Sequence, residues 1–211
     1  MEFPEARIMV FAKAPIPGQT KTRLIPALGA EGAAELHERL VNHTLNTATQ
    51  ANLCPVQLWC AATPEHPFFS DLLQRHPITL KQQQGADLGE RMGNAFVDAL
   101  TQSPYALLIG SDTPSLSHQD LHDALMALKN GSECVLNPAE DGGYVLIGLR
   151  RADAALFHNI AWGSDTVLKT TRLRLQQQGM QWCELKTHRD IDRPEDLLLC
   201  HLPESLSRAV K

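Results

Sequence analysis

Short apolar segments alternate along the chain with longer segments in which apolar residues recur every three or four positions. A short apolar run bounded by turn-forming residues predicts a buried strand, and the longer spacing predicts an amphipathic helix. Strands are expected at 7–11, 56–60, 78–81, 105–109, 134–136, 144–147 and 182–185. Helices are expected at 31–51, 67–75, 88–99 and 121–128, after Ser164 and after Pro194. This alternation predicts an α/β fold in which helices flank a largely parallel sheet.

Length, charge and cysteine content limit the number of domains, the classes of partner and the location that are expected. The 211 residues, 43% of them hydrophobic, are enough for one substantial core, so a single domain over residues 1–211 is expected. The net charge of -5 argues against a nucleic-acid partner, and no apolar run is long enough to span a membrane. The five cysteines form no C-x-x-C pair and no signal region precedes the first strand, so a cytoplasmic location is expected.

The loop after the first strand carries the most suggestive chemistry. Two prolines and Gly18 break the strand, and Lys13, Lys21 and Arg23 lie among small or hydroxylated residues. Such a loop can hold a polyphosphate by point charge, a guanidinium fork and backbone N–H groups. The alternative is a basic surface loop without a ligand. It is not a Walker loop, because residues 18–22 lack the G-K-[ST] ending.

Three polar loops follow predicted strands, and Asp112 is the clearest candidate for a functional residue among them. The loops begin at Lys13, Gln84 and Gly110, and in a parallel sheet they meet at the edge where open α/β sheets bind ligands. A carboxylate there can bind Mg²⁺ or Mn²⁺ that bridges nucleotide phosphates. The alternative for Asp112 is a turn or helix cap, but Ser117 is the better candidate for the cap of the next helix.

Two further acidic positions leave alternatives open. Asp141 precedes two glycines and a strand, so it is either a general base or acceptor-binding group, or part of a tight hairpin turn. Asp192 precedes Glu195 by three residues, a spacing typical of a helix cap, and it is also a candidate metal ligand.

Taken together, these motifs resemble the DUF2064 family of glycosyltransferase-like proteins. The resemblance covers nearly the whole chain. It rests on the segments 11–15, 21–24, 85–92, 110–114, 141–144 and 190–197. The first loop and the segment 141–143 are also similar to 2-phospho-lactate guanylyltransferase. The segment 190–197 is similar to the C-terminal part of molybdenum-cofactor-type nucleotidyltransferases.

The resemblance implies the glycosyltransferase A fold of the nucleotide-diphospho-sugar transferase superfamily. It assigns Lys21 and Arg23 to the donor phosphates and Gly85 to the region of the base or ribose. It further assigns Asp112 to a metal ion and Asp192 to a second metal contact.

Two positions depart from the superfamily pattern. Arg193 stands where threonine is frequent, and Gly110 replaces the first residue of a strict Asp-x-Asp around Asp112. The choice between a metal and a capping role for Asp192 therefore stays open.

Two reactions fit such a site, and both need Mg²⁺ or Mn²⁺. In the first, favoured by the family resemblance, a small-molecule acceptor takes a sugar from a nucleotide diphospho-sugar. In the second, a phosphorylated acceptor attacks a nucleoside triphosphate and releases pyrophosphate, and the three loop cations favour it. The alternative from another class is a nucleotide-binding accessory protein without turnover.

Overall fold

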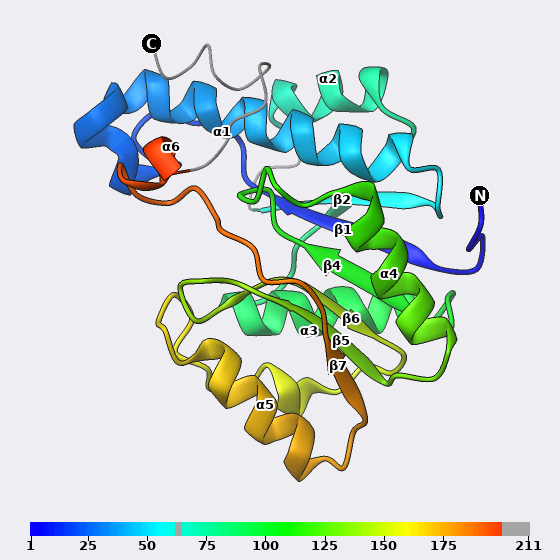
Figure 1. Ribbon diagram of the computed structural model, residues 1–211. Coiled ribbons are helices and arrows are strands. Elements are labelled where there is room, and N and C mark those ends of the chain that lie inside the picture. Colours follow the sequence, from blue (N-terminus) through cyan, green and yellow to red (C-terminus); the bar gives the residue numbers. More distant parts are fainter. Residues whose placement is uncertain (62–64, 200–211) are drawn as a thin grey trace.

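A central mixed sheet organises the protein (Figure 1). The computed structural model describes residues 1–61 and 65–199, and all statements on structure refer to these. The seven strands lie in the order β3 (Ile78–Gln82), β2 (Val56–Cys60), β1 (Arg7–Ala12), β4 (Ala106–Ile109), β6 (Tyr144–Leu149), β5 (Cys134–Pro138) and β7 (Trp182–Glu184). The expected strands are therefore all present.

Most pairs in this sheet are parallel. Strands β3, β2, β1 and β4 run parallel to one another, and β5 runs parallel to β7. Strand β6 is antiparallel to both β4 and β5. The prediction of a largely parallel sheet is confirmed, with β6 as the reversed strand that makes it mixed. Parallel pairing brings the C-terminal ends of β1, β2, β3 and β4 to one edge.

Helices cover both faces of the sheet, as Figure 1 shows. The helices are α1 (Ile25–Gln50), α2 (Pro67–Arg75), α3 (Leu88–Leu100), α4 (His118–Lys129), α5 (Val167–Gln177) and α6 (Asp196–Leu199), with short 3₁₀ turns η1 (Thr22–Leu24) and η2 (Ala154–Leu156). None of these helices is long and apolar enough to span a bilayer.

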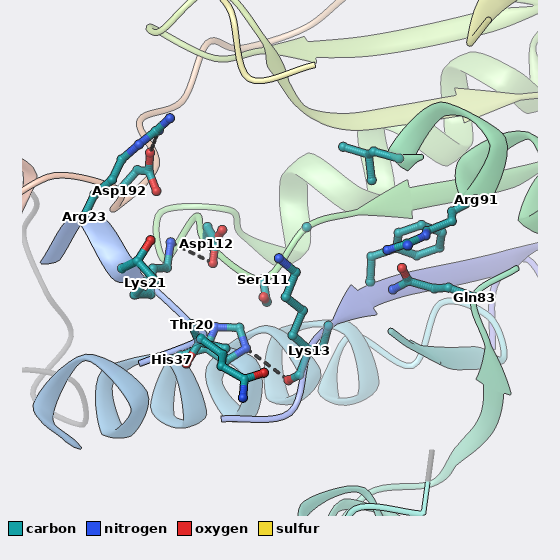
Figure 2. A pocket seen from close by; sticks show the side chains of 16 residues that line it. Lys13, Thr20, Lys21, Arg23, His37, Gln83, Arg91, Ser111, Asp112 and Asp192 are labelled. Carbon is teal, nitrogen blue, oxygen red and sulfur yellow. Dashed lines mark hydrogen bonds and ion pairs between the residues drawn. The ribbon is translucent and has the colours of Figure 1, made fainter. Parts of the chain in front are cut away.

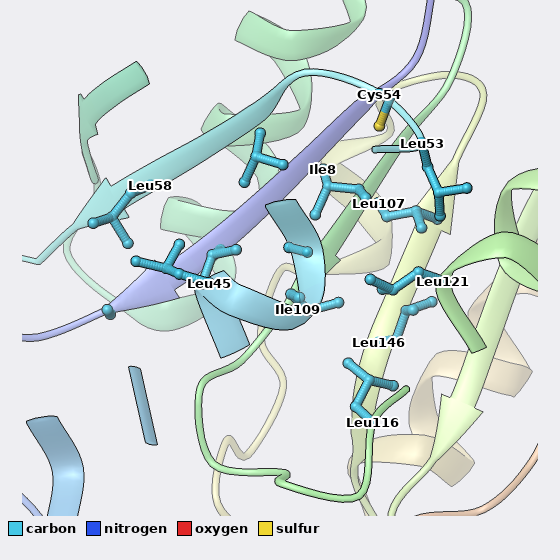
Figure 3. Packing of buried hydrophobic residues seen from close by; sticks show 14 of the residues in the cluster. Ile8, Leu45, Leu53, Cys54, Leu58, Leu107, Ile109, Leu116, Leu121 and Leu146 are labelled. Atoms are coloured by element: carbon cyan, nitrogen blue, oxygen red, sulfur yellow. The ribbon is translucent and has the colours of Figure 1, made fainter. Parts of the chain in front are cut away.

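The two faces of the sheet carry separate cores, because side chains alternate along each strand. Ile8 and Val10 of β1 face α1, α2 and α4, and this larger cluster includes Leu45 and Leu121 (Figure 3). Met9 and its neighbours on the opposite face pack against α3, α5 and η2. Burial of both faces explains why the strands read as continuous apolar runs.

The element boundaries differ from the sequence-based expectations at a few ends. Helix α1 begins at Ile25, ahead of the expected 31, and Gly29 interrupts it with φ 71°. Helix α4 begins at His118, where Ser117 and Asp120 form the expected reciprocal capping box. The helix expected after Pro194 begins at Asp196. Cys200 lies outside the described residues.

Candidate active site

The three polar loops converge on one pocket at the edge predicted for them (Figure 2). Its volume is about 530 Å³. The loop after β1 contributes Lys13 and residues 19–23, the segment after β3 contributes Gln83, and the loop after β4 contributes residues 110–112. His37 of α1, Arg91 of α3 and Asp192 complete the polar lining. Parallel strands therefore bring together residues that are far apart in sequence.

An ion pair between a buried lysine, Lys21, and a partly exposed carboxylate, Asp112, lies at one end of the pocket. The Nζ atom of Lys21 lies 2.9 Å from Oδ1 of Asp112 and donates a hydrogen bond to the Ile191 carbonyl. Only 4% of the Lys21 side chain is exposed, against 44% for Asp112. Lys21 has the left-handed φ of 49°, which is uncommon for a residue with a side chain. Figure 2 shows its ammonium group directed at the Asp112 carboxylate.

The charges around Asp112 keep it ionised. Burial disfavours the charged form, but the charge and hydrogen bond of Lys21, with the charge of Lys13, more than offset this effect and hold the pKa of Asp112 below its usual value. His37 is kept in its uncharged form, because burial lowers its pKa below the usual value. Its Nε2 lies 3.1 Å from the Lys13 carbonyl, which can only accept a hydrogen bond. The neutral ring therefore carries its proton on Nε2 and fixes the start of the loop.

Arg23 pairs with Asp192 across the mouth of the pocket. Both side chains are about half exposed. Among the residues that the structure describes, no hydrogen bond joins the Asp192 carboxylate to the last helix. Instead the Asp196 carboxylate accepts hydrogen bonds from the backbone N–H groups of Asp192, at 3.1 Å, and Arg193, at 2.8 Å. The capping hypothesis for Asp192 was therefore wrong, since the long-range partner Arg23 holds that side chain.

A carboxylate that the sequence analysis did not single out lies beside these groups. Burial raises the pKa of Asp190 to about 7, and the negative charges of Asp141, Asp112 and Asp192 add to this shift. Its Oδ1 is buried and has no hydrogen-bond partner among the described residues. The region therefore holds more negative charge than its neighbours neutralise.

The carboxylates suit a hard divalent cation in chemistry, but they are not assembled around one. Oxygen ligands are those that Mg²⁺ and Mn²⁺ prefer, and Asp112, Asp190 and Asp192 supply them. No three acidic, histidine or cysteine side chains among the described residues are arranged as a metal site. Lys21 and Arg23 pair with Asp112 and Asp192 instead. A cation bound here would compete with these two side chains.

An amide and a guanidinium group line the end of the pocket that lies away from Lys21 and Asp112. Figure 2 shows Gln83 and Arg91 there, with Lys13 between them and the pair of Lys21 and Asp112. Gln83 Nε2 donates to the Trp59 carbonyl at 2.8 Å. Arg91 Nε donates to the Gly85 carbonyl at 3.0 Å. Sequence reasoning missed Gln83 and treated Arg91 only as part of a family motif.

Three other candidate residues lie outside the lining of this pocket. Gly18, with φ 78°, permits the turn ahead of the cationic residues. Gly85 supports Arg91 through its carbonyl. Asp141 lies in the hairpin between β5 and β6, where its Oδ1 accepts a hydrogen bond from Gly143 N at 2.9 Å. The turn that was one of the two alternatives for Asp141 is thus present.

Asp141 lines a second hollow next to the first pocket. This hollow has a volume of about 580 Å³ and shares Arg23 and Asp192 with the first pocket. Its other lining includes Asp165 and Asp190, and carboxylates outnumber arginines in it. The two hollows therefore meet at the ion pair of Arg23 and Asp192.

Replacing Gly85 with alanine is expected to lower the free energy of unfolding by more than about 1 kcal/mol. Gly85 has φ 139°, and an added Cβ would lie 2.7 Å from Glu90 Cβ and 2.8 Å from Arg91 N. Chemical denaturation measures the change. Gly131→Ala is the matched control, since Gly131 has φ 113° but open space around it. Equal losses in both variants would contradict the proposed close contact.

Comparison with known proteins supports this picture of the fold. Residues 44–164 match the model of the family described as "Uncharacterized protein conserved in bacteria (DUF2064)". A solved structure from Desulfovibrio desulfuricans, described as a candidate nucleotide-diphospho-sugar transferase, is 29% identical with a TM-score of 0.82. The match covers 90% of this chain and 84% of that chain. No curated protein matches the sequence.

More distant solved structures share the fold alone. CMP:2-keto-3-deoxy-manno-octonic acid synthetase in complex with CTP is 12% identical, with a TM-score of 0.59 over 92% of this chain and 96% of that one. A manganese complex of a protein from Mycobacterium tuberculosis is 14% identical, with a TM-score of 0.55 over 92% and 97%. The fold expected from the sequence is thus confirmed. Because the family model covers more than half of its length, this chain belongs to the DUF2064 family.

Proposed function

We propose that the protein is a metal-dependent transferase that uses a nucleotide-activated donor. The observation that carries the proposal is the pair of Lys21 and Asp112, 2.9 Å apart, at one end of a pocket whose other end holds Gln83 and Arg91. Lys21, Arg23 and Lys13 suit the phosphates of the donor, and the far end suits its base. The 29% identical candidate nucleotide-diphospho-sugar transferase adds support.

A divalent cation, Mg²⁺ or Mn²⁺, would be held by Asp112 and Asp192. It would neutralise charge on the donor phosphates as the bond to the leaving group breaks. The surplus of negative charge around Asp190 supports a cation in this region. Lys21 and Arg23 would then turn from their carboxylates toward the phosphate oxygens, where they stabilise the charge that develops on the leaving group.

The second hollow is the proposed place of the acceptor, and its charge favours glycosyl transfer. A hydroxyl or amine acceptor would attack the anomeric carbon of the donor sugar, and the nucleoside diphosphate would leave. Asp141 lines this hollow and is the candidate to accept the proton from the acceptor. A phosphorylated acceptor would meet the carboxylates of this hollow and be repelled by them.

Nucleotidyl transfer is the second candidate. In that reaction the acceptor attacks the α-phosphorus of a nucleoside triphosphate and pyrophosphate leaves. The three cations Lys13, Lys21 and Arg23 in one loop favour it. The likeness in fold to a synthetase that was solved with CTP is consistent with it. A nucleotide-binding accessory protein without turnover is the third candidate.

The leaving group distinguishes the reactions. We expect purified protein with Mg²⁺ or Mn²⁺, a panel of nucleotide sugars and pooled small acceptors to release nucleoside diphosphate, measured by a coupled assay. Nucleoside triphosphates in the same assay should release no pyrophosphate. Release of pyrophosphate instead would support nucleotidyl transfer and contradict glycosyl transfer. Thermal stabilisation by nucleotides without any release would support the accessory role.

A further inference from the structure

One loop, residues 157–166, makes close contacts with elements of both the first pocket and the second hollow. It joins η2 to α5, and its residues Gly163 and Asp165 line the second hollow. Its backbone approaches two other segments at glycine residues, Gly89 in the first turn of α3 and Gly142 in the turn between β5 and β6. Glycine permits such close approach because it has no Cβ atom.

The contact at Gly142 leaves no room for a side chain. A Cβ atom on Gly142 would lie 2.2 Å from the Asp165 carbonyl oxygen and 2.7 Å from the Asp165 Cα. Gly142 has φ 90°, and its carbonyl accepts a hydrogen bond from Leu168 N at 2.9 Å. The turn that carries Asp141 is therefore held against the loop by backbone atoms. Asp141 and Asp165 both line the second hollow, and this contact fixes their relative position.

The contact at Gly89 connects the other end of the loop to the first pocket. A Cβ atom on Gly89 would lie 2.3 Å from the Phe157 carbonyl oxygen and 2.8 Å from Trp162 Nε1. The buried Phe157 ring stacks on Phe96 of α3, with ring centroids 5.8 Å apart. Leu88, the neighbour of Gly89, lines the first pocket. The loop therefore joins an element of the first pocket to an element of the second hollow.

An aromatic pair holds the loop between the two glycine contacts. The rings of Trp162 and Tyr144 meet edge to face, with centroids 6.5 Å apart. Tyr144 begins β6 directly after the turn that carries Asp141. Because the loop is held at three points, a shift of its backbone alters the position of this turn relative to α3. Transfer between two bound molecules is sensitive to such a shift, since a displacement of about 1 Å can lower a rate about 100-fold.

We propose that Gly142 is a positioning residue for the transfer reaction and that Gly89 supports it through the loop 157–166. The contact with Asp165 holds Asp141 where it takes the proton from the acceptor, and the contact at Gly89 fixes the distance of this base from the donor. The proposal rests on the proposed function, because it assumes that the acceptor binds in the second hollow. Both glycines act through other residues.

Replacing Gly142 with alanine tests the first contact. We expect the rate of nucleoside diphosphate release from the nucleotide-sugar panel, at saturating donor and acceptor, to fall at least about tenfold. The affinities for GDP, CDP, ADP and UDP with Mn²⁺, measured by calorimetric titration, should stay within about twofold of the wild type, because the first pocket is left intact. An unchanged rate would overturn the proposal.

Asp141→Asn distinguishes a positioning role from a general loss of structure. Removal of the proposed base should itself lower the rate about 100-fold. If Gly142 acts through Asp141, adding Gly142→Ala to Asp141→Asn should lower the remaining rate by less than about twofold. Losses that multiply in the double variant would overturn the proposal, because the glycine contact would then serve the fold in general.

Gly89→Ala tests the second contact and also decides the proposal if Gly142→Ala does not fold. Gly89 lies inside α3, so alanine adds the steric contact without strain in φ. We expect the rate at saturating donor to fall at least about tenfold in this variant, and to fall less than about twofold in the Asp141→Asn background. A change in nucleotide affinity with an unchanged rate at saturating donor would overturn the proposal.

Each variant has a matched control. Gly93 lies one turn further along α3, and a Cβ atom there would make an ordinary contact of 3.6 Å with Phe157 Cδ2. Gly179 has φ 64° and open space around it, so Gly179→Ala adds strain in φ without a steric contact. Gly93→Ala and Gly179→Ala should both keep the wild-type rate. Wild-type release that neither Gly89→Ala nor Gly142→Ala changes would overturn the inference alone, whereas no release by the wild type would overturn the proposed function as well.

Discussion

Replacing Asp112 with asparagine is expected to abolish the dependence of nucleotide binding on Mg²⁺ or Mn²⁺ and to lower turnover by about 10²- to 10³-fold. The amide retains the shape of the carboxylate but loses the charge that a divalent cation requires. Thermal shift assays with and without the metal, and product release at saturating donor, measure the two effects. Stabilisation by nucleotide plus metal that is unchanged in the variant would contradict the metal role.

Asp98→Asn is the control for the loss of a surface carboxylate. Asp98 pairs with Lys81 at 3.1 Å, and neither residue lines the pocket. This variant should keep metal-dependent binding in full. A loss similar to that of Asp112→Asn would mean that the change in net charge, rather than the site, explains the result.

The ion pair of Lys21 and Asp112 is also expected to make the free energy of unfolding depend on pH. The pKa of Asp112 is lower in the folded protein than its ordinary value of 3.8. Its ion pair with Lys21 therefore stabilises the fold at pH values above 3.8, and this contribution is lost as the pH falls through the folded pKa. Stability of the wild type and of Asp112→Asn should accordingly converge in acid, which denaturation at a series of pH values measures.

Replacing Lys21 with methionine is expected to weaken nucleoside diphosphate binding by about 10- to 100-fold. Binding of the corresponding nucleoside should change little, because Lys21 lies at the phosphate end of the pocket. Methionine occupies much of the volume of the buried lysine stem, so the packing around this side chain is largely kept. Calorimetric titration with both ligands measures the difference.

Lys81→Met removes a cation outside the pocket and is the matched control for this variant. It should bind both ligands as the wild type does. If Lys21→Met weakened nucleoside and diphosphate binding equally, the loss would reflect a disturbed loop and not a lost phosphate contact. If neither changed, the phosphate role of Lys21 would be contradicted.

The fold and the place of the site could be predicted because both depend on local patterns. The apolar run 105–109 is long enough to predict a buried strand, and β4 indeed occupies the centre of the sheet. Parallel neighbours then require that the loops after β1 and β4 meet at one edge, as Lys21 and Asp112 do. The capping box at Ser117 was predictable because its two partners are three residues apart.

The remaining features depend on contacts between distant segments. Asp192 has the spacing of a cap, yet its carboxylate pairs with Arg23, 169 residues away. Gln83 acquires its orientation from the Trp59 carbonyl on a neighbouring strand. The raised pKa of Asp190 depends first on its burial and then on the charges of Asp141 and Asp112, which the fold brings close to it. Such contacts join residues that are far apart in the sequence, so local sequence patterns do not predict them.

The pocket between Lys21 and Arg91 is proposed to bind a nucleotide through its phosphates with a divalent cation. Calorimetric titration of the wild-type protein with a nucleoside diphosphate and its nucleoside, each with and without Mn²⁺, tests it most directly. We expect the diphosphate to bind in the presence of Mn²⁺ at least about 100-fold more tightly than the nucleoside, and this advantage to fall sharply without the metal. Equal binding of both ligands, or affinities that do not depend on Mn²⁺, would contradict the claim.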